Sequence, residues 1–241
     1  MDADIAERVS PWARTDSRGQ ARGVRRADKR EAVLRTAARL FNAQGFHATA
    51  LDQVAEALQV TKPTLYRYVS SKDEILFECV RAGLQMMREG VAASRAAGGS
   101  ALDQLVAGMR TYARIVTADF GMSVIRIGED PLPAPGRAQL RALKREIDLE
   151  FRRLIEQGIA EGALRPCDAR LAAFTLAGAL SWIGRWYRAD GGMTPEQIAD
   201  ACVDLLLRGV LADGVLPPQP QRSPPGRRRA PAKKSPPGDT P

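Results

Sequence analysis

The sequence predicts an all-α protein of about nine helices, and three observations support this prediction. Apolar residues recur with the 3.6-residue period of an amphipathic helix over most of residues 27–213. Residues that start helices (Ser, Thr, Asp) and a residue that stops them (Gly) stand between these runs. Strand-like alternation and Asn-Gly hairpin signals are missing between the same limits.

Caps and glycines set the ends of the expected helices. Gly45 is expected to end the first helix, while Thr49 and Thr61 are expected to cap the second and third. Residues 71–74 have the spacing of a capping box, which predicts a long helix after them. The expected helices cover about residues 27–44, 49–58, 61–68, 72–95, 100–118, 120–128, 137–161, 168–189 and 194–213.

The formal net charge is +8, and its excess lies at the two ends of the chain. Residues 1–70 hold twelve Lys and Arg against eight Asp and Glu, and residues 214–241 hold six against one. Such uneven basicity indicates a polyanionic partner, although solubility alone would also explain it. Residues 1–25 lack periodicity and residues 215–241 are Pro-rich, so both are expected to be disordered, as a basic arm and a basic tail.

Several classes of function find no support in the sequence. His47 is the single histidine, expected to be a loop residue that is near the DNA backbone or simply exposed, and Cys79, Cys167 and Cys202 are too far apart to hold a metal. The cysteines are interpreted as small core residues of a cytoplasmic protein. A phosphate loop, a nucleophile motif, a signal peptide and a membrane span are all missing. We therefore expect no enzyme, cofactor, metal or membrane partner.

Residues 49–68 have the pattern of a helix-turn-helix. A tight turn at Gln59–Val60 joins two short helices, and Val60 and Leu65 are expected to pack inward. A structural hairpin would share this pattern. The exposed side of the second helix favours DNA binding, because it offers hydroxyls and cations without an acidic residue, as a surface that faces phosphates does. Those side chains are Thr61, Lys62, Thr64, Arg67 and Tyr68.

Residues 33–76 resemble the N-terminal DNA-binding domain of TetR-family repressors. The matching residues are Ala37-Ala38, Leu40-Phe41, Gly45, Thr49, Val54-Ala55, Thr61, Leu65-Tyr66, Tyr68-Val69 and Ser71-Lys72-Asp73. The chain departs from the family at Tyr68, Val69 and Pro63, where His, Phe, and Gly or Ala are common. The resemblance implies a helix-turn-helix domain over residues 26–72 and a ligand-binding and dimerisation domain over residues 73–214.

Eight side chains are expected to contact double-stranded operator DNA. Thr49 is expected to cap the second helix and to direct its hydroxyl to a phosphate. The resemblance implies phosphate contacts for Tyr66, Tyr68 and Lys72 as well. The full set is Thr49, Thr61, Lys62, Thr64, Tyr66, Arg67, Tyr68 and Lys72.

Base contacts are assigned by side-chain chemistry. Lys62 suits guanine acceptors, Thr64 suits a thymine methyl or a nearby acceptor, and Arg67 suits a base or a phosphate. The arginines of the N-terminal arm are expected either to follow the minor groove or to be merely solvated. They are Arg18, Arg22, Arg25 and Arg26.

The last two expected helices are apolar on more than one face, so each needs two partners. The second partner is expected to be the same helix pair of another copy, which gives a four-helix homodimer interface. A monomer with a fully buried central helix is the alternative. The expected interface residues are Ala177, Gly178, Ser181, Trp182, Leu205 and Leu206.

The C-terminal half resembles TetR-family regulators of fatty-acid, acyl-CoA and steroid catabolism. The resemblance rests on Trp186-Tyr187-Arg188-Ala189-Asp190-Gly191 and Thr194-Pro195-Glu196. It implies an effector pocket suited to a lipid-like ligand such as an acyl-CoA, with Arg126 or Arg185 facing its carboxylate or phosphate. The same apolar side chains would also suit a plain core. The expected ligand-binding residues are Met109, Tyr112, Val116, Phe120, Phe151 and Phe174.

These features predict a cytoplasmic repressor that a small apolar ligand, such as an acyl-CoA, releases from a palindromic operator. The alternative is an architectural DNA-binding protein without an effector, whose basic tails supply the affinity.

Overall fold

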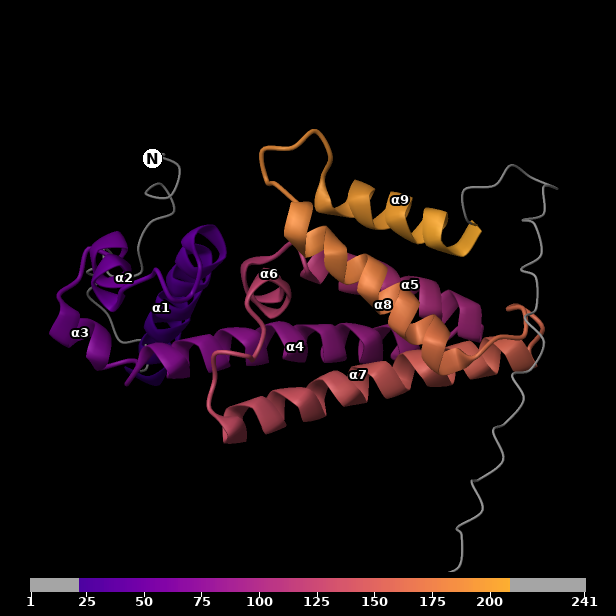
Figure 1. Ribbon diagram of the computed structural model, residues 1–241, viewed down its shortest axis with the longest axis horizontal. Coiled ribbons are helices and arrows are strands. Elements are labelled where there is room, and N and C mark those ends of the chain that lie inside the picture. Colours follow the sequence, from indigo (N-terminus) through magenta and orange to yellow (C-terminus); the bar gives the residue numbers. More distant parts are fainter. Residues whose placement is uncertain (1–21, 209–241) are drawn as a thin grey trace, which may run out of the picture.

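The computed structural model describes residues 22–208, which form helices and no strand (Figure 1). The expected all-α class is confirmed. Residues 1–21 and 209–241, with most of the expected arm and the whole expected tail, lie outside the described part. The helices are α1 (Arg22–Gln44), α2 (Leu51–Ala57), α3 (Lys62–Tyr66), α4 (Lys72–Ala96), α5 (Ala101–Ile115), α6 (Asp119–Arg126), α7 (Ala134–Ala160), α8 (Ala169–Trp186) and α9 (Pro195–Arg208).

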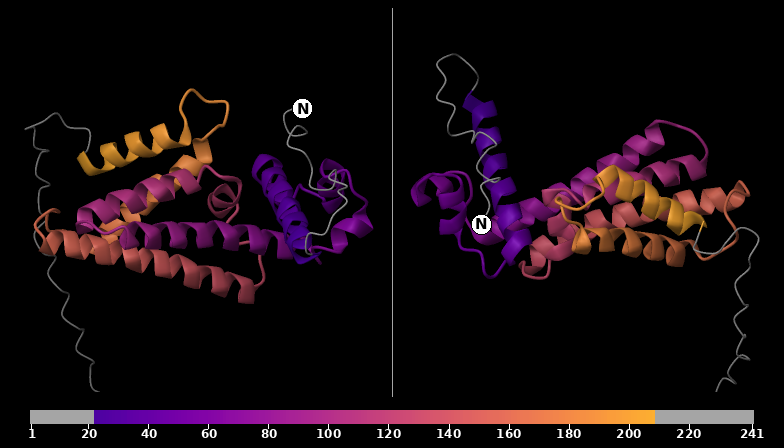
Figure 2. Two further views of the ribbon diagram at one scale, coloured as in Figure 1. Left: turned by 180° about the vertical axis from the view of Figure 1, so that it is seen from behind. Right: turned by 90° about the horizontal axis from the view of Figure 1, so that it is seen from above.

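Helices α1 to α3 form a small unit at one end of an elongated molecule (Figures 1 and 2). Helix α4 begins beside this unit and runs along the rest, with α7 lying beside it and α5 and α8 crossing above. The short α6 lies at the junction and contacts α1, α4 and α8, while α9 packs on α5. None of the described helices is both long and apolar enough to cross a membrane.

The first helix begins at Arg22, and the expected boundary at residue 27 is wrong. Arg22 and Arg25 therefore belong to a helix and not to an extended arm. Polar contacts accompany this early start, since Arg26 donates to the carbonyl of Arg67 at 3.4 Å and Arg30 pairs with Glu74 at 3.1 Å. Apolar periodicity could not reveal them, because it registers only the buried face of a helix.

Side-chain caps account for several helix starts. Thr61, Ser100 and Asp168 each accept a backbone N–H from the first turn of α3, α5 and α8. Ser71 accepts from the Glu74 N–H at 3.0 Å, but the Glu74 carboxylate returns to the Ser70 N–H, so only half of the expected capping box forms.

One hydrophobic core continues from the N-terminal unit into the rest of the molecule, largely along α4. Cys79 lies inside it, where burial raises the pKa of its thiol and Leu34 supplies a carbonyl at 3.4 Å. Cys202 is half-buried. Cys167 is exposed in the loop between α7 and α8, so its assignment to the core was wrong.

Helices α4 and α6 approach each other closely at Gly83. A Cβ atom there would lie 2.6 Å from the Phe120 carbonyl oxygen and 2.7 Å from a Val124 methyl. Real side chains do not make such contacts, so the absence of a side chain allows this crossing.

Replacing Gly83 with alanine is expected to lower the free energy of unfolding by about 1–3 kcal/mol, because α6 must move away from α4. Gly108→Ala is the matched control, since its Cβ would meet Phe151 at an ordinary 3.8 Å. That control should instead gain up to about 1 kcal/mol from helix propensity. Chemical denaturation of both variants measures the difference, and equal effects would contradict the close-packing account.

Candidate DNA-binding surface and effector cavity

Helices α2 and α3 have the geometry of a helix-turn-helix. Gln59 adopts a positive φ of 55° after α2, which reverses the chain within a tight turn. The Val60 N–H then donates to the Ala55 carbonyl at 3.0 Å. Leu65 is fully buried beneath the turn, as expected from the sequence. The hairpin is therefore fixed to the core, and α3 presents its other side to solvent.

The outer side of α3 collects most of the expected DNA-binding residues. Thr61 caps the helix, and its hydroxyl lies 2.9 Å from that of Thr64. Tyr66 keeps 46% of its surface exposed, so its hydroxyl and ring are accessible on this side. Lys62 and Arg67 are also exposed, while Thr64 and Tyr68 are half-buried.

Thr49 does not have the expected role. Ala50 is the N-cap of α2, and Thr49 is buried, with a 1% exposed surface. Its hydroxyl donates to the Gly45 carbonyl at 2.8 Å and accepts from the Gln44 amide at 3.2 Å. Gln53 supplies the cap in its place, accepting from the Ala50 N–H at 2.8 Å. Thr49 therefore holds the α1–α2 loop and is not placed to reach a phosphate with its hydroxyl.

Lys72, at the first position of α4, lies beside the same surface. Its ammonium donates to the His47 carbonyl at 3.2 Å and lies 4.5 Å from the centre of the Phe46 ring. His47 is exposed in the loop before α2, as expected. These contacts hold the Lys72 charge near the N-terminus of α2.

The structure adds Asp52 to this surface, a residue that the sequence analysis did not single out. Its carboxylate pairs with the Lys62 ammonium at 2.8 Å, and this hydrogen bond and charge raise the pKa of Lys62. Both side chains are exposed, so the pair is weak in stability terms. Its ten-residue separation spans the turn, which is why the pattern of α3 alone did not reveal it.

A cavity of about 270 Å³ lies within the second part of the molecule, between α4, α5, α6, α7 and α8. Tyr112, Phe151 and Phe174 line it, as expected. Met109, Val116 and Phe120 do not, and those three predictions were wrong. Met109 and Val116 are fully buried core residues, and Phe120 lies beside a separate hollow next to α1. The remaining wall is formed by Leu84, Met87, Val124, Ile125, Lys144, Ile147, Asp148, Ala173, Ala177 and Ser181.

Two residues expected at a subunit interface face this cavity instead. Ala177 lines it, and the Ser181 hydroxyl lies 2.8 Å from that of Tyr112. Burial raises the pKa of Tyr112 despite this hydrogen bond, so the two hydroxyls form a neutral polar pair in a wall that is otherwise apolar except for Lys144 and Asp148. Around the axis of α8, Ala177 and Ser181 lie about 100° from the outward face. This offset explains why they were wrongly expected at the subunit interface.

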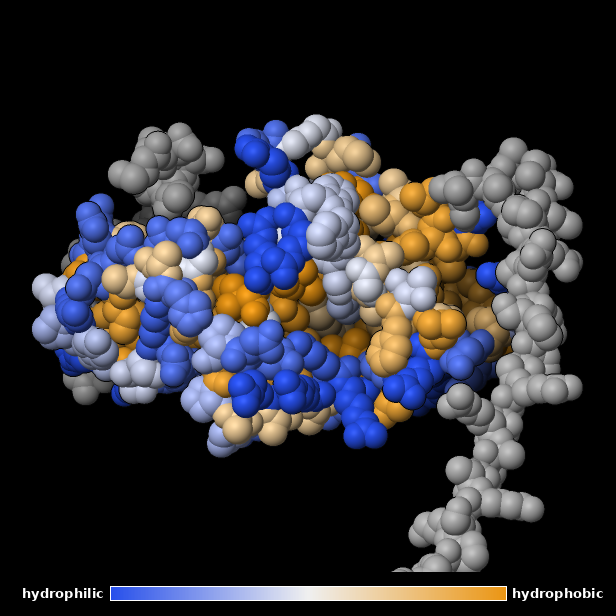
Figure 3. Space-filling view, in the orientation of Figure 1, coloured by the Kyte–Doolittle hydropathy of each residue, from blue (hydrophilic) through white to orange (hydrophobic). Residues whose placement is uncertain are grey.

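The outward face of α8 is an exposed apolar stripe. Leu171 and Trp182 keep 66% and 64% of their surfaces exposed, and Gly178 between them has open space around it. On α9, Leu205 is 51% exposed, whereas Leu206 packs against its own core and does not face outward as expected. Figure 3 shows apolar surface gathered over α8 and α9, and mostly polar surface over α1 to α3.

Arg126, expected to meet a ligand anion, is already occupied. Its guanidinium donates to the carbonyls of Gly184 at 2.8 Å, Asn42 at 3.1 Å and Tyr187 at 3.3 Å. Burial, and then the charge of Arg185, lower its pKa. It thus joins α6 to the end of α1 and to α8, which leaves the exposed Arg185 as the other expected partner of a ligand anion.

A fixed helix-turn-helix with an exposed, acid-poor recognition helix, joined to a helical domain with an internal cavity, defines a DNA-binding regulator. The family model of tetR bacterial regulatory proteins matches residues 33–79, and that of tetracyclin repressor-like C-terminal domains matches residues 98–210. The chain belongs to the TetR family and is a DNA-binding transcriptional regulator. The expected family and DNA-binding function are confirmed, and the architectural alternative is not favoured.

Known proteins extend this relationship over both domains. The TetR-family regulator PfmR from Thermus thermophilus has a TM-score of 0.68 and 30% identity, over 75% of this chain and 99% of PfmR. AibR in complex with isovaleryl coenzyme A and operator DNA has a TM-score of 0.66 and 29% identity, over 73% and 96%. The HTH-type transcriptional repressor KstR2 of Rhodococcus jostii is 28% identical over 195 residues, 77% of this chain and 92% of KstR2.

The Asp52–Lys62 pair should restrain DNA binding. Asp52→Asn removes an anion from the surface and frees Lys62 for a phosphate or a base. We expect affinity for duplex DNA to rise roughly threefold to tenfold and the salt slope to steepen by about one. Fluorescence anisotropy over a salt series measures both. Glu56→Gln removes the same charge from α2 without touching Lys62, and an equal gain for that variant would contradict the role of the pair.

Proposed function

We propose that the protein is a cytoplasmic, homodimeric repressor that binds a palindromic operator and leaves it when a small apolar ligand occupies the cavity, and that it catalyses no reaction. One observation supports this proposal most strongly. The helices that wall the cavity, α4 and α6, are the same helices that hold the DNA-binding unit. An architectural DNA-binding protein would have no use for that arrangement.

The operator contacts are proposed for the exposed side chains around α3. Lys62 and Thr64 are assigned to base edges, because α3 is the helix that enters the major groove. Tyr66, Tyr68 and Lys72 are assigned to phosphates, Arg67 to either class, and Thr61 to capping α3. Thr49 is left out of this set because its hydroxyl is buried and engaged.

The homodimer interface is proposed for the outward stripe of α8 and α9. Large apolar patches on a soluble protein mark contact surfaces, and a two-fold axis lets the same stripe serve both subunits. Gly178 allows close approach of the two α8 helices, since nothing lies within 4 Å of its Cβ position. The proposed interface contains Leu171, Gly178, Trp182, Trp186 and Leu205.

The ligand signal is proposed to travel through the junction of α6 with α1. Val124 and Ile125 of α6 line the cavity. On the same helix, the Asp119 carboxylate pairs with Arg39 at 2.9 Å and its carbonyl accepts from Asn42 at 2.8 Å. A ligand that displaces the cavity wall therefore also displaces α1, and the spacing of the two recognition helices changes from the roughly 34–36 Å that successive major grooves require.

The ligand class is proposed from the lining and from the relatives. The wall of the cavity is mostly apolar, with one neutral hydroxyl pair and two charged residues, Lys144 and Asp148. AibR, which shares the fold, has been solved with isovaleryl coenzyme A and operator DNA. A small acyl group is accordingly the proposed occupant.

Selection of binding sites from a random duplex pool at physiological salt tests the proposed function. We expect a palindromic consensus, and we expect a ligand that binds the cavity to release that duplex. Linkage requires the operator to weaken ligand binding by the same factor. A flat selection with salt-sensitive binding, or equal ligand affinity with and without operator, would contradict the proposal.

Trp182→Ser should weaken the dimer. Removing a large aromatic side chain from the centre of the stripe is expected to raise the dimer dissociation constant by roughly tenfold or more, and operator affinity should fall with it. Met193→Ser is the control, because this side chain is 47% exposed but lies in the loop outside the stripe. Sedimentation velocity over a concentration series distinguishes the variants, and an unchanged Trp182→Ser dimer would place the interface elsewhere.

A further inference from the structure

A second hollow, of about 400 Å³, adjoins the effector cavity on the outside of α7 and α8. The two share Lys144, Asp148 and Phe174, so they are direct neighbours, and we call the effector cavity the inner part and the second hollow the outer part. The inner part is mostly apolar, whereas the outer part is rimmed by cations. We call these cations the basic rim, and they are Lys144, Arg145, Arg152 and Arg170.

The basic rim carries more positive charge than its own carboxylates neutralise. Asp148, the one acidic residue lining the outer hollow, pairs with Arg152. Lys144 pairs with Glu129. Burial opposes ionisation of the Glu129 carboxyl, but the contact with Lys144 holds the pKa of Glu129 below its usual value. Arg145 and Arg170 form no ion pair with any residue between 22 and 208 and are exposed.

Phe174 lines both the inner and the outer part. Its ring is 50% exposed and lies 5.1 Å from the Arg152 guanidinium and 5.6 Å from that of Arg170. A ligand that occupied both parts would lie beside this ring and close to both guanidinium groups. The arrangement suits a molecule with an apolar end and an anionic end.

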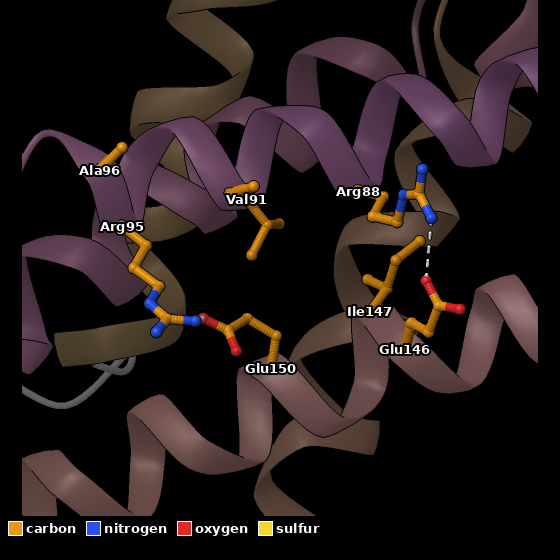
Figure 4. A pocket seen from close by; sticks show the side chains of 8 residues that line it. Arg88, Val91, Arg95, Ala96, Glu146, Ile147 and Glu150 are labelled. Atoms are coloured by element: carbon orange, nitrogen blue, oxygen red, sulfur yellow. Dashed lines mark hydrogen bonds and ion pairs between the residues drawn. The ribbon is translucent and has the colours of Figure 1, made fainter.

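A groove between α4 and α7 offers a useful contrast (Figure 4). It has about 410 Å³ of space, with two arginines and two glutamates at its sides. There Arg88 pairs with Glu146 at 3.1 Å and Arg95 with Glu150 at 3.8 Å, so the charges satisfy each other across the groove. In the basic rim, by contrast, the cations are not all neutralised by neighbouring carboxylates. A bound anion would neutralise the remaining positive charge.

We propose that the effector is a coenzyme A thioester, with its acyl group in the inner cavity and its phosphates on the basic rim, bound by Arg145 and Arg170. This inference rests on the proposed function. Each arginine guanidinium can donate two parallel hydrogen bonds to the oxygens of a phosphate. A single carboxylate near the cavity would not use the donors of both arginines. Cations spread over two helices match a headgroup with several phosphates.

The inner volume limits the acyl group. About 270 Å³ is at the lower end of the roughly 300–1,000 Å³ that pockets for small organic ligands span. Leu84, Met87, Ile147 and Phe151 line it and are buried, and Phe151 keeps only 4% of its surface exposed. The structure thus favours a short or branched acyl group over a long chain.

The test uses the full-length protein, titrated calorimetrically with isovaleryl-CoA, palmitoyl-CoA and free isovalerate. We expect isovaleryl-CoA to bind, and palmitoyl-CoA and isovalerate to bind at least about tenfold more weakly. Binding should weaken with added salt, because phosphate contacts are screened. Isovalerate binding as tightly as its thioester would overturn the headgroup assignment, and palmitoyl-CoA binding as tightly would overturn the short acyl group.

The paired variant Arg145→Gln/Arg170→Gln identifies the residues. It should lose at least about tenfold in affinity for isovaleryl-CoA, while the unliganded protein keeps its melting temperature and its affinity for the selected operator. Arg165→Gln removes a similarly exposed arginine from outside the rim and should change neither. An equal loss in Arg165→Gln would show a bulk charge effect and overturn the assignment.

The same variants separate this inference from the proposed function. If a phosphate-free apolar compound releases the operator from the wild type and from Arg145→Gln/Arg170→Gln alike, the repressor proposal stands and the basic rim assignment is wrong. If the protein binds its operator and neither thioesters nor phosphate-free compounds release it, both are wrong.

Discussion

Asn42, near the end of α1, connects the two halves of the molecule. Its side-chain amide donates to the Asp119 carbonyl, its side-chain oxygen accepts from Ser123, and its own carbonyl accepts from Arg126. All three partners belong to the short α6, which also crosses α4 closely at Gly83. Directional hydrogen bonds constrain orientation as well as distance. The DNA-binding unit therefore cannot tilt about α4 without rearranging α6, and α6 cannot move without changing the cavity wall.

Helix α8 divides its sides between two different tasks. One side carries Ala173, Ala177 and Ser181 to the cavity, and another side carries Leu171 and Trp182 to the surface. Both sides are apolar, so the sequence pattern of the helix is hydrophobic around most of its girth. In the proposed function, occupancy of the cavity and packing between subunits therefore involve the same helix, and a change in either alters the other.

The fold was predictable because its signals are local. Apolar period, caps and glycines lie within a few residues of the features that they determine, and they located the helices and the turn at Gln59–Val60. The α3 surface was predictable for the same reason. What the sequence could not reveal are contacts between distant residues: Arg126 meets carbonyls 58 and 84 positions away. Thr49 was misassigned because its hydroxyl turns inward to Gly45, a choice that tertiary packing makes.

The placement of Lys72 has a consequence for the entropy of binding. A free lysine side chain samples many rotamers, and ordering it costs up to about 2 kcal/mol. In the unbound protein its ammonium already rests on the Phe46 ring and the His47 carbonyl. Much of that ordering is completed when the chain folds. In the phosphate contact that we propose for Lys72, the DNA would therefore meet a positioned charge, and more of the attraction between them would remain as affinity.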